Sequence, residues 1–228
     1  NIAIGKDAAL GITTGDNNVA IGYAAYDAAD GAESENIAIG IAALGNLNHD
    51  GATRNMAIGN FAGNGMGTVG AQIDNTFIGA NAGGGTWANN VSSYNVGIGN
   101  YSMDAAMNGA LYNTGVGYAA LSSLTTGDRN TAVGYQALTT CSTGEENIAI
   151  GRGSLDAAVS ASYNVAIGTN ALGTVDDGET FNIAIGYDAM GNANHADIDS
   201  NIAIGGYALD AIGTNAHTGT IAIGHGAL

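Results

Sequence analysis

The residues Asn130–Leu138, NTAVGYQAL, carry a pattern that recurs along the whole sequence and indicates the fold. The same phrase reads NIAIGKDAAL at Asn1 and TIAIGHGAL at Thr220, and it occurs thirteen times in 228 residues. Successive copies start 17 to 20 residues apart. A short motif at a nearly fixed period indicates stacked repeats, each of which needs its neighbours to bury its apolar side chains. We number the positions of each repeat from its Asn, or from Thr220 in the last copy.

The first five positions of the repeat predict a β-strand. Positions 2 and 4 carry mainly β-branched residues, such as Ile2 and Ile4, and this alternation has the period of a strand. No charged residue occurs in the thirteen pentads, which indicates a strand covered on both faces, as in parallel sheets. The sequence therefore predicts an all-β fold, a parallel β-solenoid or β-roll of about thirteen turns with 17–20 residues per turn.

Each recurring position has an expected role. The Asn of position 1 would stack on the Asn of the next turn as an amide ladder. The Ile or Val of position 4 would form the core with the Ala and Leu of positions 8 and 9, which are interpreted as a second short strand. The Gly of position 5 allows a sharp turn or a close backbone approach. The structural ladder residues are Asn1, Asn18, Asn36, Asn55, Asn130, Asn147, Ile4, Ile21, Ile39, Gly5, Gly22, Gly40 and Gly134.

The repeat runs from end to end, so we expect a single continuous domain over residues 1–228. Residues 36–49 (NIAIGIAALGNLNH) resemble residues 182–195 (NIAIGYDAMGNANH), and this offset of 146 residues indicates a duplicated block of eight turns. Because the chain starts and ends within repeats, we interpret it as an excerpt of a longer repetitive protein. Position 3 is Ala or Gly except at Phe77. This row of small residues would pack against the chain's own second strand or against another chain.

The composition limits the possible partners. Twenty acidic and four basic residues give a net charge of −16, so repulsion from phosphate makes nucleic acid an unsuitable partner. No apolar stretch is long enough to cross a membrane, and we expect no membrane insertion by this segment. The single cysteine, Cys141, allows no disulfide within the chain. We expect no cofactor. The acidic pairs Glu145–Glu146 and Asp176–Asp177 could bind Ca²⁺, although solvated loop charge is the simpler interpretation.

The sequence offers little to suggest a catalytic centre. Ser102 and Ser154 replace the packed Ala of position 8 and are expected in the core, not as nucleophiles. His49 and His195 are equivalent positions of the long repeat. They would lie eight turns apart, too far for a shared metal at about 4.8 Å per stacked strand. The motif is spread evenly along the chain, which argues against an enzyme.

Aromatic residues are the candidate contacts. Tyr23, Tyr118, Tyr135 and Tyr187 directly follow the Gly of position 5, and Trp87 lies in the longest loop. A second group directly precedes the Asn of position 1 and comprises Tyr94, Tyr112 and Tyr163. Exposed tyrosine rows would stack on sugar rings or on a partner surface. The alternative is that they shield the ends of the strands.

The phrase N-[STIV]-A-[IV]-G-x-x-A resembles the head repeats of trimeric autotransporter adhesins and related repeats of bacteriophage tail fibres. The resemblance covers essentially the whole chain as thirteen copies and rests on positions 1, 3, 4, 5 and 8. It implies a left-handed parallel β-roll of three chains on a bacterial cell surface or a virion. It also implies adhesion to host matrix, to cells or to other copies of the protein.

We therefore expect a structural, non-enzymatic, extracellular fibre or adhesin segment that assembles as a homotrimer or filament. Its partners would be copies of itself and a host or neighbouring cell surface, a matrix protein or a glycan. One alternative is a bacteriophage tail-fibre shaft. Another is a β-helix enzyme acting on polysaccharide or acyl donors, because IG-x-x-A also resembles the hexapeptide of left-handed β-helix acyltransferases. That hexapeptide recurs three times per turn, whereas here the phrase occurs once. Ice binding would need a regular threonine array, which most turns lack.

Overall fold

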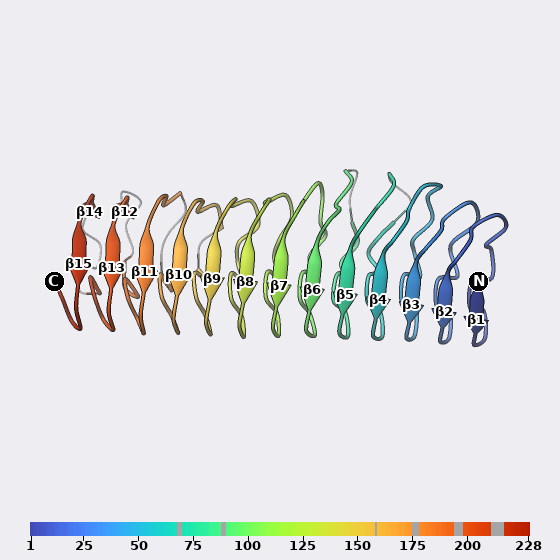
Figure 1. The fold of residues 1–228 in the computed structure, drawn as a ribbon, viewed down its shortest axis with the longest axis horizontal. Helices are drawn as coiled ribbons and strands as arrows, with labels where there is room; N and C mark the ends of the chain where they lie inside the picture. The colour runs from blue at the N-terminus through green and yellow to red at the C-terminus, as the bar shows by residue number, and fades with distance from the viewer. Residues whose placement is uncertain (68–69, 88–89, 158, 175–177, 194–197, 211–216) are drawn as a thin grey trace. The chain divides into compact units, whose positions relative to one another are not determined.

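The computed structural model describes residues 1–67, 70–87, 90–157, 159–174, 178–193, 198–210 and 217–228. Within these ranges the chain contains strands and turns but no helix. It divides into two compact units, Asn1–Asn113 and Thr114–Leu228, and each unit is a parallel β-solenoid (Figure 1). The predicted fold class is confirmed at this level. The prediction of a single continuous domain over residues 1–228 stays a prediction.

The first unit contains six strands of three residues each, and every strand lies within one pentad. They are β1 (Ile2–Ile4), β2 (Val19–Ile21), β3 (Ile37–Ile39), β4 (Met56–Ile58), β5 (Thr76–Ile78) and β6 (Val96–Ile98). Neighbouring strands are parallel, follow the order of the sequence and pair equal positions of the repeat, such as Ala20 with Ala38. The recurring motif therefore fixes the register of the sheet.

The second unit continues this pattern with seven strands in pentads. They are β7 (Thr114–Val116), β8 (Thr131–Val133), β9 (Ile148–Ile150), β10 (Val165–Ile167), β11 (Ile183–Ile185), β13 (Ile202–Ile204) and β15 (Ile221–Ile223). The short strands β12 (Ile198–Asp199) and β14 (His217–Thr218) form a second parallel sheet just before the pentads. Counted from each pentad strand to the next, the first unit makes five complete turns and the second makes six. The prediction of about thirteen turns is therefore slightly too high.

From β2 onward the strands bury position 3 and turn positions 2 and 4 outward, so the predicted isoleucine core is wrong. In the terminal strand β1 all three residues are exposed. Ala20 and Ala38 are fully buried, whereas Ile4, Ile21 and Ile39 point outward and are partly or largely exposed. The interior also holds the side chains of positions 1, 8 and 9, which leaves room for a methyl group but not for a larger side chain at position 3. Alternation was predicted correctly, but the face that it buries was not.

Positions 6 to 9 form a stacked turn in place of the predicted second strand. Positions 7 and 9 adopt left-handed backbone angles, as Ala42 (φ 49°) and Leu44 (φ 51°) show. Residues with a side chain rarely adopt this conformation. Here the Ala42 N–H donates to the Tyr23 carbonyl and the Leu44 N–H to the Ala62 carbonyl, both at 2.9 Å in adjacent turns. These bonds between turns offset the local backbone cost.

The asparagines of position 1 form the predicted ladder inside the solenoid. Asn147 Oδ1 accepts the Asn164 backbone N–H at 3.1 Å, and Asn147 Nδ2 donates to Asn130 Oδ1 at 3.0 Å and to the Ala161 carbonyl at 2.7 Å. In the first unit, Asn55 Oδ1 accepts the backbone N–H of the next Asn at 3.2 Å. Buried polar groups need such partners, and therefore the ladder fixes the pentads of adjacent turns to one another.

The glycine of position 5 is required for two reasons. Its φ is strongly positive, as at Gly22 (138°) and Gly134 (146°), a conformation that favours glycine. A Cβ on Gly134 would also collide with the backbone carbonyl of Gly151 in the next turn. The predicted close backbone approach is therefore confirmed.

Phe77 is the exception among the small residues of position 3, and glycines make the space for it. Its ring is fully buried. A Cβ added to Gly83 or to Gly97 would lie 2.8 Å from Phe77 Cδ1. Gly83 occupies position 9, which is Leu or Met in most turns, and Gly97 is the position 3 residue of the following turn. The volume of the interior is thus kept by exchanging a large residue between positions.

Candidate binding surfaces

The outward side chains of positions 2 and 4 form an apolar surface in each unit, which we call the strand face. In the second unit it includes Val133 (37% exposed), Ile148 (40%), Ile150 (39%) and Ile204 (37%). Isolated apolar side chains on a surface are ordinary, but contiguous apolar patches in soluble proteins mark interaction sites. The strand face repeats along consecutive strands and is therefore a candidate interface.

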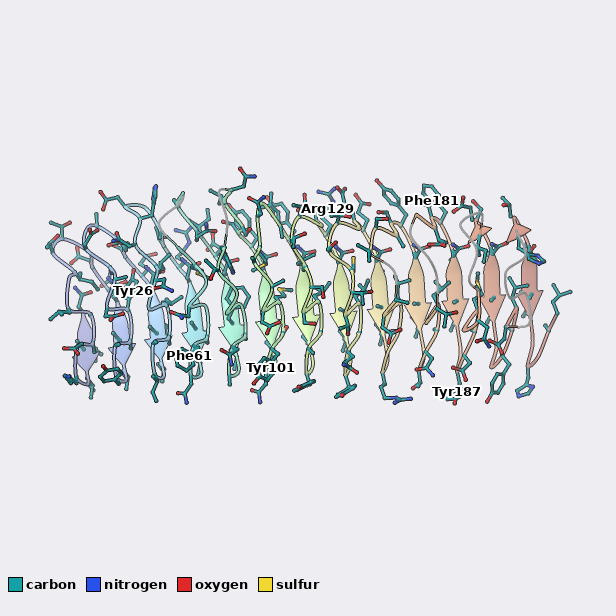
Figure 2. The ribbon with its side chains drawn as sticks, turned by 180° about the vertical axis from the view of Figure 1, so that it is seen from behind. Tyr26, Phe61, Tyr101, Arg129, Phe181 and Tyr187 are labelled. Atoms are coloured by element: carbon teal, nitrogen blue, oxygen red, sulfur yellow. The ribbon has the colours of Figure 1, made fainter. Side chains whose placement is uncertain are left out.

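A row of exposed side chains borders one end of the strands and consists of the residues that directly precede each Asn. We call it the pre-Asn row. In the second unit Arg129 Nε pairs with Glu146 Oε1 at 3.0 Å, and Arg129 Nη2 pairs with Glu145 Oε2 at 3.3 Å. Tyr163 and Phe181 follow as a stacked pair, with ring centres 5.0 Å apart. Figure 2 shows Arg129 and Phe181 at this end of the strands.

In the first unit the pre-Asn row contains a similar succession of side chains. Arg54 binds Asp74 with two hydrogen bonds of 2.7 and 2.8 Å, and this contact lowers the pKa of the Asp74 carboxyl. Tyr94 and Tyr112 stack with ring centres 4.9 Å apart and ring planes 7° apart. Both units thus carry an arginine–carboxylate contact followed by an aromatic pair. The Glu145–Glu146 pair, a candidate for Ca²⁺, is engaged with Arg129 instead.

The predicted tyrosines that follow Gly all lie on the surface, at the other end of the strands. We call this the post-Gly row. Tyr23, Tyr118, Tyr135 and Tyr187 are each about half exposed. Lys6 Nζ lies 5.6 Å from the centre of the Tyr23 ring, and Tyr118 stacks on Tyr135 at 5.4 Å. Their role as contacts stays a prediction.

Stacking restricts what the aromatic rows can bind. Where two rings face each other, as Tyr118 and Tyr135 do, the faces turned toward each other are unavailable to a sugar ring. The outward edges and hydroxyls remain accessible. Recognition through these pairs would therefore use ring edges and hydrogen bonds, and stacking on a sugar is the weaker interpretation.

Trp87 was predicted as a loop contact, and this prediction is wrong. The side chain is only 5% exposed. It packs edge to face against Phe77, with ring centres 5.8 Å apart and planes at 80°. A Cβ on Gly65 would lie 2.7 Å from Trp87 Cδ1. The indole is held in the core because Phe77 and the neighbouring glycines create a site of matching volume.

Sequence reasoning missed four exposed aromatic residues that extend the two rows. They are Phe61, Tyr101, Phe181 and Tyr207. The signal was present, because each lies at position 7 or directly before an Asn, but the turn geometry that exposes these positions was not recognised. Figure 2 shows Phe61 and Tyr101 of the first unit, and Tyr187 of the second, beyond the ends of their strands.

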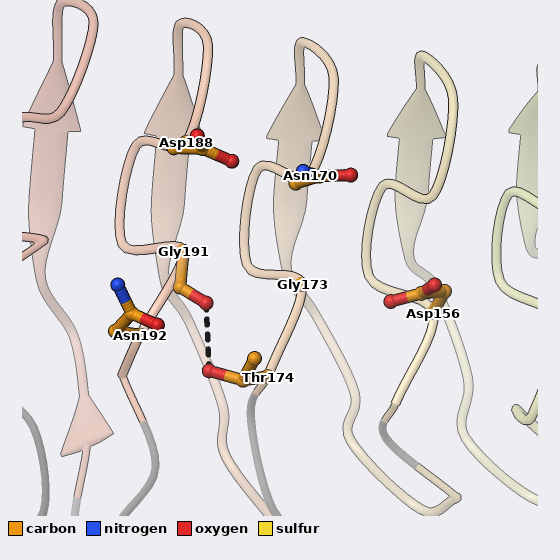
Figure 3. A pocket seen from close by; sticks show the side chains of 7 residues that line it. All are labelled: Asp156, Asn170, Gly173, Thr174, Asp188, Gly191 and Asn192. Carbon is orange, nitrogen blue, oxygen red and sulfur yellow. Dashed lines mark hydrogen bonds between the residues drawn. The ribbon is translucent and has the colours of Figure 1, made fainter.

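A polar pocket of about 290 Å³ lies on the second unit, where successive turns contribute equivalent residues (Figure 3). Its lining residues are Asp156, Asn170, Gly173, Thr174, Asp188, Gly191 and Asn192. Two glycines at position 10 leave the hollow open. Thr174 Oγ1 donates to the Gly191 carbonyl at 2.7 Å, and burial raises the pKa of the Asp156 carboxyl. The pocket is acidic, because two of its lining side chains are carboxylates.

The remaining candidates show little sign of reactivity. Ser102 and Ser154 are buried, as predicted. Cys141 is also buried, and burial raises the pKa of its thiol to about 11. In the described parts of the chain, no three His, Cys, Asp or Glu side chains lie close enough together to hold a metal ion. His195, Asp176 and Asp177 lie outside the described residues.

Comparisons with known protein families, with curated proteins and with solved structures find no match to this chain. Among the described residues, the structure contains no helix that is long and apolar enough to span a membrane.

Proposed function

We propose that this chain is a structural, non-enzymatic segment of an extracellular fibre or adhesin that assembles with copies of itself through the strand face. The observation that carries the proposal is the outward position of the β-branched side chains at positions 2 and 4. Ile148 and Ile150 of β9 are 40% and 39% exposed, and their equivalents repeat on the other strands. Covering such a surface is favourable by about 25 cal/mol per Å² of apolar area removed from water.

A second copy is the occupant that fits this face. The strand face is free of charged residues, so the remainder of the strongly acidic chain would stay hydrated when the strand faces of three copies meet around a common axis. Rows of equal spacing on two copies match each other along many turns, because both repeat at the strand spacing of about 4.8 Å. We propose a homotrimer on a bacterial cell surface, and a virion fibre would use the same physical contact.

The edge rows would then carry recognition of other surfaces. Arg54, Tyr94 and Tyr112 belong to one edge, and Tyr23 belongs to the other. They combine aromatic area with charged and hydroxyl groups, the composition of many protein interfaces. We propose that they contact a host or neighbouring cell, a matrix protein or a glycan.

The test is the mass of the chain in solution and its response to a charge on the strand face. Wild-type chain at micromolar concentration should show three times the 22.4 kDa mass by light scattering. Ile148→Asp should reduce it to the monomer. Val159→Asp is the matched control, because Val159 is equally exposed at 40% but lies outside the strands; it should leave the assembly intact. A wild-type monomer, or equal effects of the two variants, would exclude assembly through this face.

A further inference from the structure

Two tyrosine pairs on the surface stack face to face, a geometry that the proposed function does not use. A third surface pair, Tyr187–Tyr207, differs from them because its rings meet edge to face, with planes 67° apart. Tyr94 and Tyr112 stack at 4.9 Å with planes 7° apart, and Tyr118 and Tyr135 stack at 5.4 Å with planes 10° apart. The first pair lies in the pre-Asn row of the first unit, and the second in the post-Gly row of the second unit. Each pair joins two consecutive turns of its solenoid. All four rings are between 40% and 53% exposed, so a small oxidant can reach them.

We propose that Tyr94–Tyr112 and Tyr118–Tyr135 are sites of oxidative cross-linking, at which a dityrosine bond joins consecutive turns. The oxidant is hydrogen peroxide acting through a haem peroxidase or a comparable one-electron catalyst. The inference is independent of the mode of self-assembly, because both rings of each pair belong to the same chain.

The chemistry requires the two phenols to react together. Each phenol loses one electron and its hydroxyl proton, which gives a phenoxyl radical with spin on the carbons ortho to the oxygen. One ortho carbon of each ring then forms the new carbon–carbon bond. Both rings regain aromaticity as the ortho hydrogens leave as protons and the oxygens are protonated again. In total the pair loses two electrons and two protons, which reduce one hydrogen peroxide to two waters.

The fold favours partners within the chain over partners on other chains. The Tyr112 N–H donates to the Ser93 carbonyl at 3.3 Å, and the Tyr94 N–H donates to the Ile73 carbonyl at 3.1 Å, so both backbones are fixed in the ladder of turns. Holding two reactants side by side raises their effective concentration far above that of free chains. Because the side chains extend into solvent, the rings can rotate from the stacked arrangement until their ortho carbons meet.

The chain contains a natural control for this reaction. Tyr163 and Phe181 stack in the pre-Asn row of the second unit at 5.0 Å with planes 10° apart. This geometry is close to that of Tyr94–Tyr112, but Phe181 has no phenol to oxidise. The pair should therefore stay uncoupled in the wild-type chain, and Phe181→Tyr should make it reactive.

The experiment treats the folded chain with a haem peroxidase and limiting hydrogen peroxide. Dityrosine fluorescence is measured first, and cross-linked peptides are then identified by mass spectrometry from a monomer band on a denaturing gel. We expect one peptide that joins Tyr94 to Tyr112 and another that joins Tyr118 to Tyr135, each two hydrogens lighter than its parts. Tyr112→Phe should remove only the first, and Phe181→Tyr should add a third cross-link, to Tyr163.

Two further measurements separate the proposal from non-specific oxidation. Tyr23→Phe removes an exposed tyrosine that stands beside Lys6, and it should leave both cross-links unchanged. Unfolding in urea before oxidation should abolish the preference for the two pairs. The proposal is overturned if the native chain couples only to other chains, if the unfolded chain gives the same cross-links, or if Phe181→Tyr gains none. Circular dichroism confirms that each variant is folded.

Discussion

Most strands turn their smallest residue inward and their larger residues outward: position 3 is usually alanine, whereas positions 2 and 4 are mainly isoleucine or valine. Ala166 of β10 is fully buried, whereas Val165 and Ile167 beside it are half-buried on the outside. Hydrophobicity alone would place the larger residues inside. The interior is instead limited by its width, because asparagine, alanine and leucine of the other positions already fill it. Available volume, and not apolar character, therefore decides which face is buried.

The turn that contains Phe77 supports this interpretation. Here the large residue is at position 3, and position 9 is reduced to Gly83. In ordinary turns the reverse holds, as with Ala38 and Leu44, both fully buried. Two arrangements of side chains thus fill the same space. Substitutions inside the solenoid should therefore lower the free energy of unfolding unless a second substitution restores the volume. Substitutions on the outer face should change it little.

The largest effect is expected at the glycine that ends each strand. Gly134→Val would place a branched side chain against the Gly151 carbonyl. It would also require valine to adopt a φ of 146°, which residues with a side chain rarely do. Backbone strain and steric conflict together should cost more than about 4 kcal/mol of unfolding free energy, measured by urea denaturation. Gly67→Val is the control, since its Cβ would meet nothing nearer than 3.9 Å. An unchanged Gly134→Val midpoint would contradict the close approach of the turns.

A smaller loss is expected on emptying the interior at β5. Phe77→Ala removes a fully buried ring and should cost about 3–5 kcal/mol. The double substitution Phe77→Ala with Gly83→Leu restores the ordinary arrangement, and it should recover part of this loss because leucine already occupies position 9 elsewhere at a φ near that of Gly83 (62°). Phe61→Ala, on an exposed ring, is the control. If the double variant is no more stable than Phe77→Ala, the side chains of positions 3 and 9 do not fill the same interior space.

An intermediate effect is expected at Tyr26, the buried tyrosine in the first unit. Asn36 Nδ2 donates to its hydroxyl at 2.7 Å, and Tyr26→Phe should cost about 1 kcal/mol through loss of this bond. Figure 2 shows the ring within the turns. Urea denaturation at neutral pH measures this loss, and Tyr23→Phe, on an exposed ring, is the control.

Burial, and secondarily the charge of Glu33, raise the pKa of Tyr26 far above its usual 10.0. The unfolded chain releases the phenol proton at the usual pKa while the folded chain keeps it. The stability that depends on this difference is therefore complete below about pH 10 and declines as the pH rises further. Stability curves of wild type and Tyr26→Phe should converge at alkaline pH, and a constant gap would exclude this titration.

The smallest effect is expected on the outer face. Ile150→Thr keeps the β-branched shape at a position that is 39% exposed, and it should change the stability of the isolated chain by less than about 0.5 kcal/mol. The measurement is urea denaturation at a concentration where the chain is monomeric. A loss as large as that of Phe77→Ala would mean that the outer face is part of the core of a single chain.

Much of the architecture could be predicted from the repeat. The strands, their parallel register, the asparagine ladder and the obligatory glycine follow from a motif whose copies must stack on each other. The burial of Ser102 and Ser154 follows because they replace a packed alanine. The candidate contacts could be predicted only in part: the four tyrosines that follow Gly are exposed, whereas Trp87 is buried. The burial of Trp87 depends on its contact with Phe77 in the same turn, and local composition does not reveal that contact.

The repeat specifies where the strands lie and which positions meet between turns, because a period of two and a period of 17–20 residues leave one way to stack. It does not specify which face of the strand lies inside, since alternation is symmetric between the two faces. That choice depends on how the folded turns pack. The left-handed backbone at positions such as Ala42 and Leu44 folds the second half of the motif into a tight turn, which in most turns leaves room only for a small residue at position 3. The isoleucines consequently lie on the surface, where they are available to a partner.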